Sequence, residues 1–154
     1  MPTSASTGVV DAGVILTRLD RRRRSHAEAL ALFERSSGGT LDLHISVVNL
    51  AEALQHTRAY THATGIDVIA VLNSFRVAIH RPDVEIARAV AALSTLEDAS
   101  LADRFALGTA RFLAARLHTT DRVLATMARR CRIPSALLLM FSERFDAVTV
   151  TVLG

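Results

Sequence analysis

Four acidic residues lie where a parallel α/β fold would bring their side chains together. Asp11 and Asp121 each come just after a short apolar segment that predicts a strand, whereas Asp103 and Glu52 fall within the first two turns of predicted helices. Parallel α/β sheets bind ligands beyond the carboxyl ends of their strands. Carboxylates that meet there repel one another, and a hard divalent cation such as Mg²⁺ relieves the repulsion. Such a cation can activate water for attack at phosphorus, so these residues predict phosphodiester cleavage.

Each of the four carboxylates also has a purely structural interpretation. Asp11 can cap a helix, and Asp121 is a favourable charge at a helix N-terminus. Asp103 follows Ser100 at the spacing of a capping box, and Glu52 can lie on the solvated face of an amphipathic helix. These alternatives stay open for each residue taken singly. The occurrence of all four near strand ends favours a shared metal site.

The elements that would position these residues alternate between strand and helix. Strands are expected over Gly8–Val10, Leu41–Ser46, Val77–His80, Leu117–Thr119 and Ala147–Leu153. Helices are expected from Ala27 to the stop at Gly38, and over Val47–Thr64, Ile66–Phe75, Val84–Leu96, Leu101–Arg116 and Asp121–Cys131. This alternation predicts a single α/β domain over residues 1–154, with a mostly parallel sheet of about four or five strands flanked by helices on both faces. Residues 1–7 are expected to fray, and residues 132–154 to form a C-terminal strand and a packing segment.

Composition excludes several classes of protein. All 18 basic residues are arginine, which removes mechanisms that need a P-loop, Schiff-base or receiver-domain lysine. Charge-free stretches such as Ile133–Ser142 have ten residues, against the roughly 20 of a membrane span. The single Cys131 and the absence of a leader pattern predict a cytoplasmic protein without membrane association. The net charge of +3 suits a polyanionic partner. The run Arg21–Arg24 either contacts an RNA backbone or begins a solvated helix.

Four segments carry a resemblance to a known family. They resemble the motifs of PIN-domain ribonucleases, in particular the VapC-like toxins of bacterial type II toxin–antitoxin pairs. The segments are Val9–Asp11, Ile45–Glu52, Ser100–Arg104 and Thr119–Arg122. Their acids are separated by 41, 51 and 18 positions, which suits such a domain, and the resemblance spans residues 9–130. The last two motifs, with a helix between them, are the most specific.

The resemblance implies a PIN-like fold and a metal-dependent endoribonuclease that leaves a 5′-phosphate and a 3′-hydroxyl. By this resemblance Asp11, Glu52, Asp103 and Asp121 are the catalytic acids that hold Mg²⁺ or Mn²⁺. Asp11 and Asp103 would be the core ligands. Glu52 would bind the metal directly or position the attacking water, and Asp121 would support a second metal or act through water.

Four further residues are expected at the substrate. Arg104 and Arg122 each follow an expected metal ligand in the sequence. They could form bidentate contacts with phosphate groups or, alternatively, surface salt bridges. By the resemblance, Asn49 would orient Glu52 or contact substrate, and Thr119 would help shape the pocket. The resemblance also implies a homodimer and a cognate antitoxin protein that wraps the first helices and reaches into the acidic pocket.

One departure from the family pattern concerns Ala12, which stands where many members have a hydroxyl residue. The missing hydroxyl predicts weaker support for the neighbouring Asp11 and hence weaker metal binding. The alternative to an enzyme is a catalytically inactive PIN-like module that binds RNA or protein. The presence of all four acids favours the enzyme.

Overall fold

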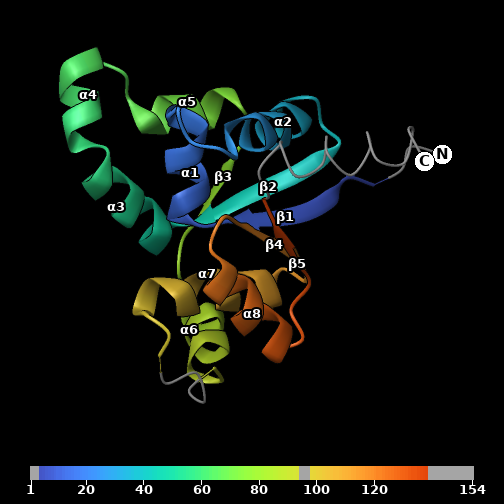
Figure 1. Cartoon of the computed structure of the whole chain (residues 1–154). Coiled ribbons are helices and arrows are strands. Elements are labelled where there is room, and N and C mark those ends of the chain that lie inside the picture. The colour runs from blue at the N-terminus through green and yellow to red at the C-terminus, as the bar shows by residue number, and fades with distance from the viewer. Residues whose placement is uncertain (1–3, 94–97, 139–154) are drawn as a thin grey trace, which may run out of the picture.

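A five-stranded, all-parallel sheet forms the centre of the protein in the computed structural model, which describes residues 4–93 and 98–138 (Figure 1). The strand order is β3-β2-β1-β4-β5. The strands are β1 Ser6–Val10, β2 Leu41–Ser46, β3 Ala78–His80, β4 Arg116–Thr119 and β5 Ser135–Leu137. The predicted α/β class with a parallel sheet is confirmed.

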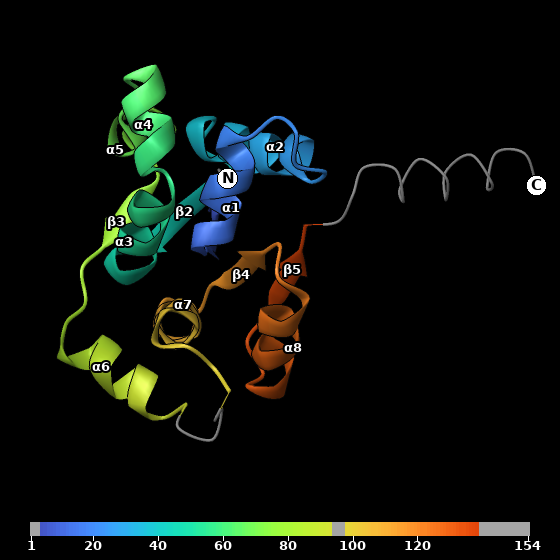
Figure 2. The ribbon, with the colours of Figure 1, turned by 60° about the vertical axis from the view of Figure 1, so that its left-hand side comes forward.

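Helices cover both faces of this sheet. The helices are α1 Ala12–Leu19, α2 His26–Ser37, α3 Val47–His56, α4 Arg58–Thr64, α5 Val68–Ser74, α6 Val84–Ala91, α7 Leu101–Phe112 and α8 Arg122–Arg130. Figures 1 and 2 show α1, α2, α3 and α5 on one face and α7 and α8 on the other. The covered sheet therefore has one core on each side.

The central strand β1 is buried on both faces. Successive side chains of a strand point to opposite faces, so Val10 packs with Phe33 and Ile45 in one core, whereas Val9 packs with Leu107 in the other. All five side chains are fully buried. The end of β1, and with it Asp11, is thus held in the middle of the fold.

Two predicted elements differ from the observed ones in the middle of the chain. The helix expected over Val47–Thr64 is interrupted at Thr57, which leaves helical geometry with a φ of −99° and a ψ of 6°. The Thr57 hydroxyl donates to the carbonyl of Ala53 at 2.8 Å, and this side-chain bond competes with continuation of the helix. The helix expected over Val84–Leu96 ends as α6 at Ala91.

The two ends of the chain also correct the predictions. Ser6 and Thr7, expected to fray, belong to β1 and pair with β2. The fifth strand is β5, directly after Pro134, where no strand was expected. The strand predicted over Ala147–Leu153 lies outside the described residues, as does most of the predicted packing segment.

Gly108 on α7 permits a close approach of α6. A Cβ atom at this position would lie 2.8 Å from Val90 Cγ2 and 3.2 Å from the Val90 backbone nitrogen. Alanine normally stabilises a helix by about 1 kcal/mol relative to glycine. We expect Gly108→Ala to lower the free energy of unfolding by about 1–3 kcal/mol instead, because the two helices must separate. Urea denaturation measures this, and a stabilised variant would contradict the close packing.

Candidate active site

Asp11 is held at the carboxyl edge of the sheet by two hydrogen bonds from different elements. Its Oδ1 accepts from the backbone N–H of Val14 at 3.0 Å and so caps α1. Its Oδ2 accepts from the hydroxyl of Thr119, at the end of β4, at 2.5 Å. Only 7% of Asp11 is exposed. The carboxylate is therefore buried and oriented before any ligand arrives.

Thr119 connects two of the predicted acids. Its Oγ1 donates to Asp11 and accepts from the backbone N–H of Asp121 at 3.0 Å. Asp121 then caps α8, because its Oδ1 accepts from the N–H groups of Val123 at 2.8 Å and Leu124 at 3.3 Å. Thr119 is fully buried, whereas Asp121 is exposed. One hydroxyl thus couples the ends of β1 and β4.

Asp103 is positioned by a capping box at the start of α7. The Ser100 hydroxyl accepts from the Asp103 N–H at 3.0 Å, and Asp103 Oδ2 accepts from the Ser100 N–H at 3.1 Å. Asn49, on α3, donates its side-chain amide to the carbonyl of Ala102 at 3.1 Å. This contact ties α3 to the first turn of α7, next to Asp103.

The charges of two other aspartates reach Asp11. Burial is the main reason why the pKa of Asp11 is raised to about 6; the hydrogen bonds from Thr119 and Val14 oppose this shift, and the negative charges of Asp121 and Asp103 add to it by smaller amounts. Asp103 and Asp121 therefore lie near enough to Asp11 for their charges to act on it. Their capping roles, expected as alternatives, are present as well.

Glu52 differs from Asp103 and Asp121 in its relation to Asp11. It lies half-buried on α3 and is absent from the charges that shift the pKa of Asp11. Within residues 4–93 and 98–138, no three His, Cys, Asp or Glu side chains stand in an arrangement ready to hold a metal ion. The predicted convergence of all four acids on one metal ion thus stays a prediction.

The donor chemistry of the three aspartates nevertheless fits a divalent cation. All offer hard carboxylate oxygens, which Mg²⁺ and Mn²⁺ prefer. The hydrogen bonds that the structure describes use only one oxygen each of Asp103 (Oδ2) and Asp121 (Oδ1). A cation would also favour the charged form of Asp11, whose pKa is raised mainly by burial. These residues suit a metal after side-chain adjustment.

The residues expected at the substrate are placed differently from one another. Arg122 is exposed at the start of α8, next to Asp121, and Arg104 is half-buried one position after Asp103. Asn49 is only 2% exposed. Its side-chain amide donates to the backbone of α7 at Ala102. Thr119 donates its hydroxyl hydrogen to Asp11, and its expected role in shaping a pocket stays a prediction.

Gly13 and Thr120 are site neighbours that the sequence interpretation missed. A Cβ atom at Gly13 would lie 2.9 Å from Thr120 Oγ1 and 3.4 Å from Asp11 Oδ1. Glycine at this point lets the loop after β4 approach the start of α1. A weak helix former two residues after the first acid is the signal that could have indicated a close approach.

Thr119→Val is expected to raise the pKa of Asp11 above its value of about 6, because the Thr119 hydrogen bond lowers it. Valine keeps the branched shape but cannot donate the hydrogen bond that stabilises the carboxylate. A carbon-13 NMR titration of the Asp11 carboxyl in metal-free protein measures the change. Thr119→Ser, which keeps the hydroxyl, is the matched control. Equal pKa values in all three proteins would show that the bond does not act on Asp11.

Comparisons with known proteins concern the fold. Among solved structures, the chain is similar to VapC20 of Mycobacterium tuberculosis, described as a sarcin–ricin loop cleaving toxin, with a TM-score of 0.61 and 14% identity over 77% of this chain and 93% of that chain. It is similar to VapBC-1 of nontypeable Haemophilus influenzae, with a TM-score of 0.64 and 16% identity over 86% and 98% of the two chains. It is similar to VapBC2 of Rickettsia felis, bound to a promoter DNA fragment, with a TM-score of 0.63 and 17% identity over 85% and 98%.

At these identities the likeness establishes the fold. No protein-family model matches the sequence, and no curated protein does. The resemblance to VapC-like toxins inferred from the four motifs is confirmed at the level of a PIN-like fold. In the described ranges, no helix has both the length and the apolar character to cross a bilayer.

Proposed function

We propose that this protein is a metal-dependent endoribonuclease that hydrolyses RNA phosphodiester bonds and serves as the toxin of a toxin–antitoxin pair. The observation that carries the proposal is the buried carboxylate of Asp11 at the carboxyl edge of the sheet, which the charges of Asp103 and Asp121 reach. The chain also has the fold of VapC20, which is described as a toxin that cleaves the sarcin–ricin loop. Such a cluster of anions is costly unless a cation or a substrate uses it.

In this proposal Asp11 and Asp103 are the core ligands of Mg²⁺ or Mn²⁺, and Asp121 supports a second ion or acts through water. When bound, such a cation lowers the pKa of water and offsets charge that builds up on the phosphate. Thr119 holds Asp11 in place through its hydroxyl. Glu52 binds the metal or positions the attacking water after its side chain turns toward the aspartates.

The reaction itself is a hydrolysis at phosphorus. Water attacks the phosphorus atom, the bond to the 3′-oxygen breaks, and that oxygen takes up a proton. The products carry a 5′-phosphate and a 3′-hydroxyl. Arg104 and Arg122 follow Asp103 and Asp121 in the sequence, and in this proposal they bind phosphate groups of the RNA.

A cognate antitoxin protein and a second copy of the chain complete the proposal, in a cytoplasmic setting. Support for a protein partner comes from the fold shared with the VapBC-1 and VapBC2 structures. A metal pocket that is closed by a partner can be inactive until that partner is removed. Assays of activity therefore need partner-free protein.

A second candidate function is a catalytically inactive PIN-like module that binds RNA or protein. The observation in its favour is that the described residues contain no ready-made metal arrangement. The orientation of the Glu52 side chain distinguishes the nuclease from the inactive module. The nuclease needs this side chain to turn toward Asp11, whereas the inactive module does not.

Cleavage of end-labelled RNA by partner-free protein tests the proposal. We expect cuts with Mg²⁺ or Mn²⁺, no cuts with EDTA, and recovery when excess metal is restored. The new 5′ ends should carry phosphate, which separates this activity from metal-independent ribonucleases that leave phosphate on the 3′ side. RNA retained in a binding assay without cleavage under either metal would support the inactive module instead.

A further inference from the structure

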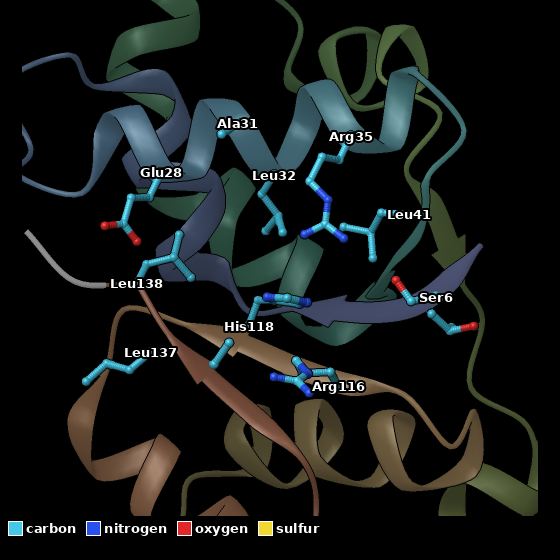
Figure 3. Close-up of a pocket in the computed structure, with 12 residues that line it drawn as sticks. Ser6, Glu28, Ala31, Leu32, Arg35, Leu41, Arg116, His118, Leu137 and Leu138 are labelled. Atoms are coloured by element: carbon cyan, nitrogen blue, oxygen red, sulfur yellow. The ribbon is translucent and has the colours of Figure 1, made fainter. Parts of the chain in front are cut away.

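A groove of about 510 Å³ lies between α2 and the sheet face of β1, β4 and β5 (Figure 3). The α2 side chains that line it follow helical spacing, from Glu28 through Leu32 to Arg35. On the sheet side, Arg116 and His118 of β4 face α2, because His118 pairs with Val10, whose side chain belongs to the core beneath α2. The groove is therefore the part of this sheet face that α2 leaves uncovered.

Small residues flank His118 in the sheet. Gly8 lets the imidazole pack closely against β1, because a Cβ atom there would lie 3.0 Å from both Cδ2 and Nε2 of the ring. On the other side of His118, the paired residue of β5 is Ala136, which lines the groove. The imidazole is 7% exposed, and its Nε2 has no hydrogen-bond partner among the residues that the structure describes.

Positive charge gathers at one end of this groove. Figure 3 shows the guanidinium groups of Arg35 and Arg116 on either side of the His118 ring, with Glu28 at the opposite end. The pKa of His118 is lowered to about 4, mainly by burial and to a smaller extent by the charges of Arg116 and Arg35. The two arginines are exposed, and neither forms an ion pair within the described part of the chain. The basic end thus has unused charge and an unused ring nitrogen.

We infer that Arg35, Arg116 and His118 bind a phosphate group of a nucleotide, either within an RNA strand or free. Guanidinium groups form paired hydrogen bonds with phosphate oxygens. A neutral imidazole can add an Nε2–H donor without bringing a third cation between the arginines. The apolar walls formed by Leu32 and Leu138 suit the sugar and base, and the volume lies within the range of small-ligand pockets.

The position of the groove relates it to the proposed cleavage site. Arg116 begins β4, and Thr119 ends the same strand beside Asp11. Three residues of strand span about 10 Å, so one RNA strand can reach both places. This RNA source rests on the proposed function, whereas binding of a free nucleotide does not.

Binding measured in EDTA tests the inference without cleavage. The probes are AMP, inorganic phosphate and a short fluorescent single-stranded RNA, with Arg35→Gln, Arg116→Gln and the control Arg58→Gln. Arg58 is an exposed arginine on α4, so its variant removes the same charge elsewhere. At about 0.1 M salt we expect each groove variant to bind RNA about fivefold more weakly, with a shallower salt dependence, and the control to bind as wild type does.

NMR signals of the His118 ring provide the second readout. If Arg35 and Arg116 had only a structural role, the ligand-induced shifts of these signals would not depend on the two arginines. Shifts with AMP and phosphate, lost in the groove variants, identify a free-nucleotide site; shifts with RNA alone identify a strand contact. Either result supports the inference. Wild-type affinity in both groove variants overturns it, and so does arginine-dependent binding of an oligoglutamate peptide in place of AMP and RNA. RNA cleavage by the same variants is assayed separately. A failure of the groove proposal can then be distinguished from a failure of the proposed nuclease site.

Discussion

Asp11→Asn is expected to lower the rate of RNA cleavage by about a thousandfold or more. In the proposed site Asp11 is a core metal ligand, and an amide is a far weaker ligand than a carboxylate. Loss of several kcal/mol of charge stabilisation in the transition state corresponds to this factor, because about 1.4 kcal/mol changes a rate tenfold. Single-turnover cleavage of a labelled RNA with Mn²⁺ measures the effect. Asp103→Asn should act similarly.

The structure offers a matched control for this substitution. Asp83 caps α6 by accepting from the N–H of Ile86 at 2.9 Å, much as Asp11 caps α1. Asp83→Asn makes the same chemical change at a helix start outside the acid cluster, and we expect it to cleave at the wild-type rate. Activity retained in both Asp11→Asn and Asp103→Asn would refute the site assignment, whatever the control does.

The same substitution, Asp11→Asn, should stabilise the metal-free protein at high pH. In the folded chain the pKa of Asp11 is about 6, whereas an unfolded aspartate has a pKa of about 3.9. The folded state therefore binds the Asp11 proton more tightly than the unfolded state does. The stability that this proton contributes is lost as the pH rises through 6. Above that pH the buried carboxylate costs about 3 kcal/mol, which asparagine avoids while it can still accept from Val14.

Urea denaturation in EDTA measures this effect as a function of pH. We expect the variant to exceed wild type by up to about 3 kcal/mol at pH 8, and the difference to vanish below about pH 4, where the wild-type carboxyl is protonated in both states. Saturating Mn²⁺ should then stabilise wild type and not the variant. A variant less stable than wild type at pH 8 without metal would mean that burial does not penalise this carboxylate.

Much of the framework was predictable because its signals are local. Apolar residues ahead of Asp11 and Asp121 mark buried strand ends, and the predicted strand Leu41–Ser46 has the observed bounds. A parallel sheet then dictates that such strand ends share one edge. Asp11 and Asp121 both follow strand ends at that edge for this reason, and the charge of Asp103, in the first turn of α7, also reaches Asp11.

The parts that were not predicted depend on tertiary contacts or on short segments. Helix α1 has eight residues and begins Ala12-Gly13, so its helical pattern is weak. Strand β5 has three residues after Pro134 and is defined by its pairing with β4. The direction of the Glu52 side chain depends on how α3 packs.

The capping and catalytic interpretations of the aspartates were treated as alternatives in the sequence, and the structure shows why they need not be. A cap occupies one carboxylate oxygen, as in Asp103 and Asp121. The other oxygen stays available to a ligand. The cap then holds the carboxylate in place, which is what a metal or substrate site requires.

The pairing of the first strand with the fourth has a consequence for synthesis on the ribosome. Asp11 leaves the ribosome early, but the hydroxyl that orients it belongs to Thr119, 108 positions later in the chain. Strand β4 must also emerge before β1 gains its second neighbour. A nascent chain therefore lacks the hydrogen bond that orients Asp11 until β4 has emerged. Under the proposed function, RNA cleavage by a nascent chain would begin only after that point.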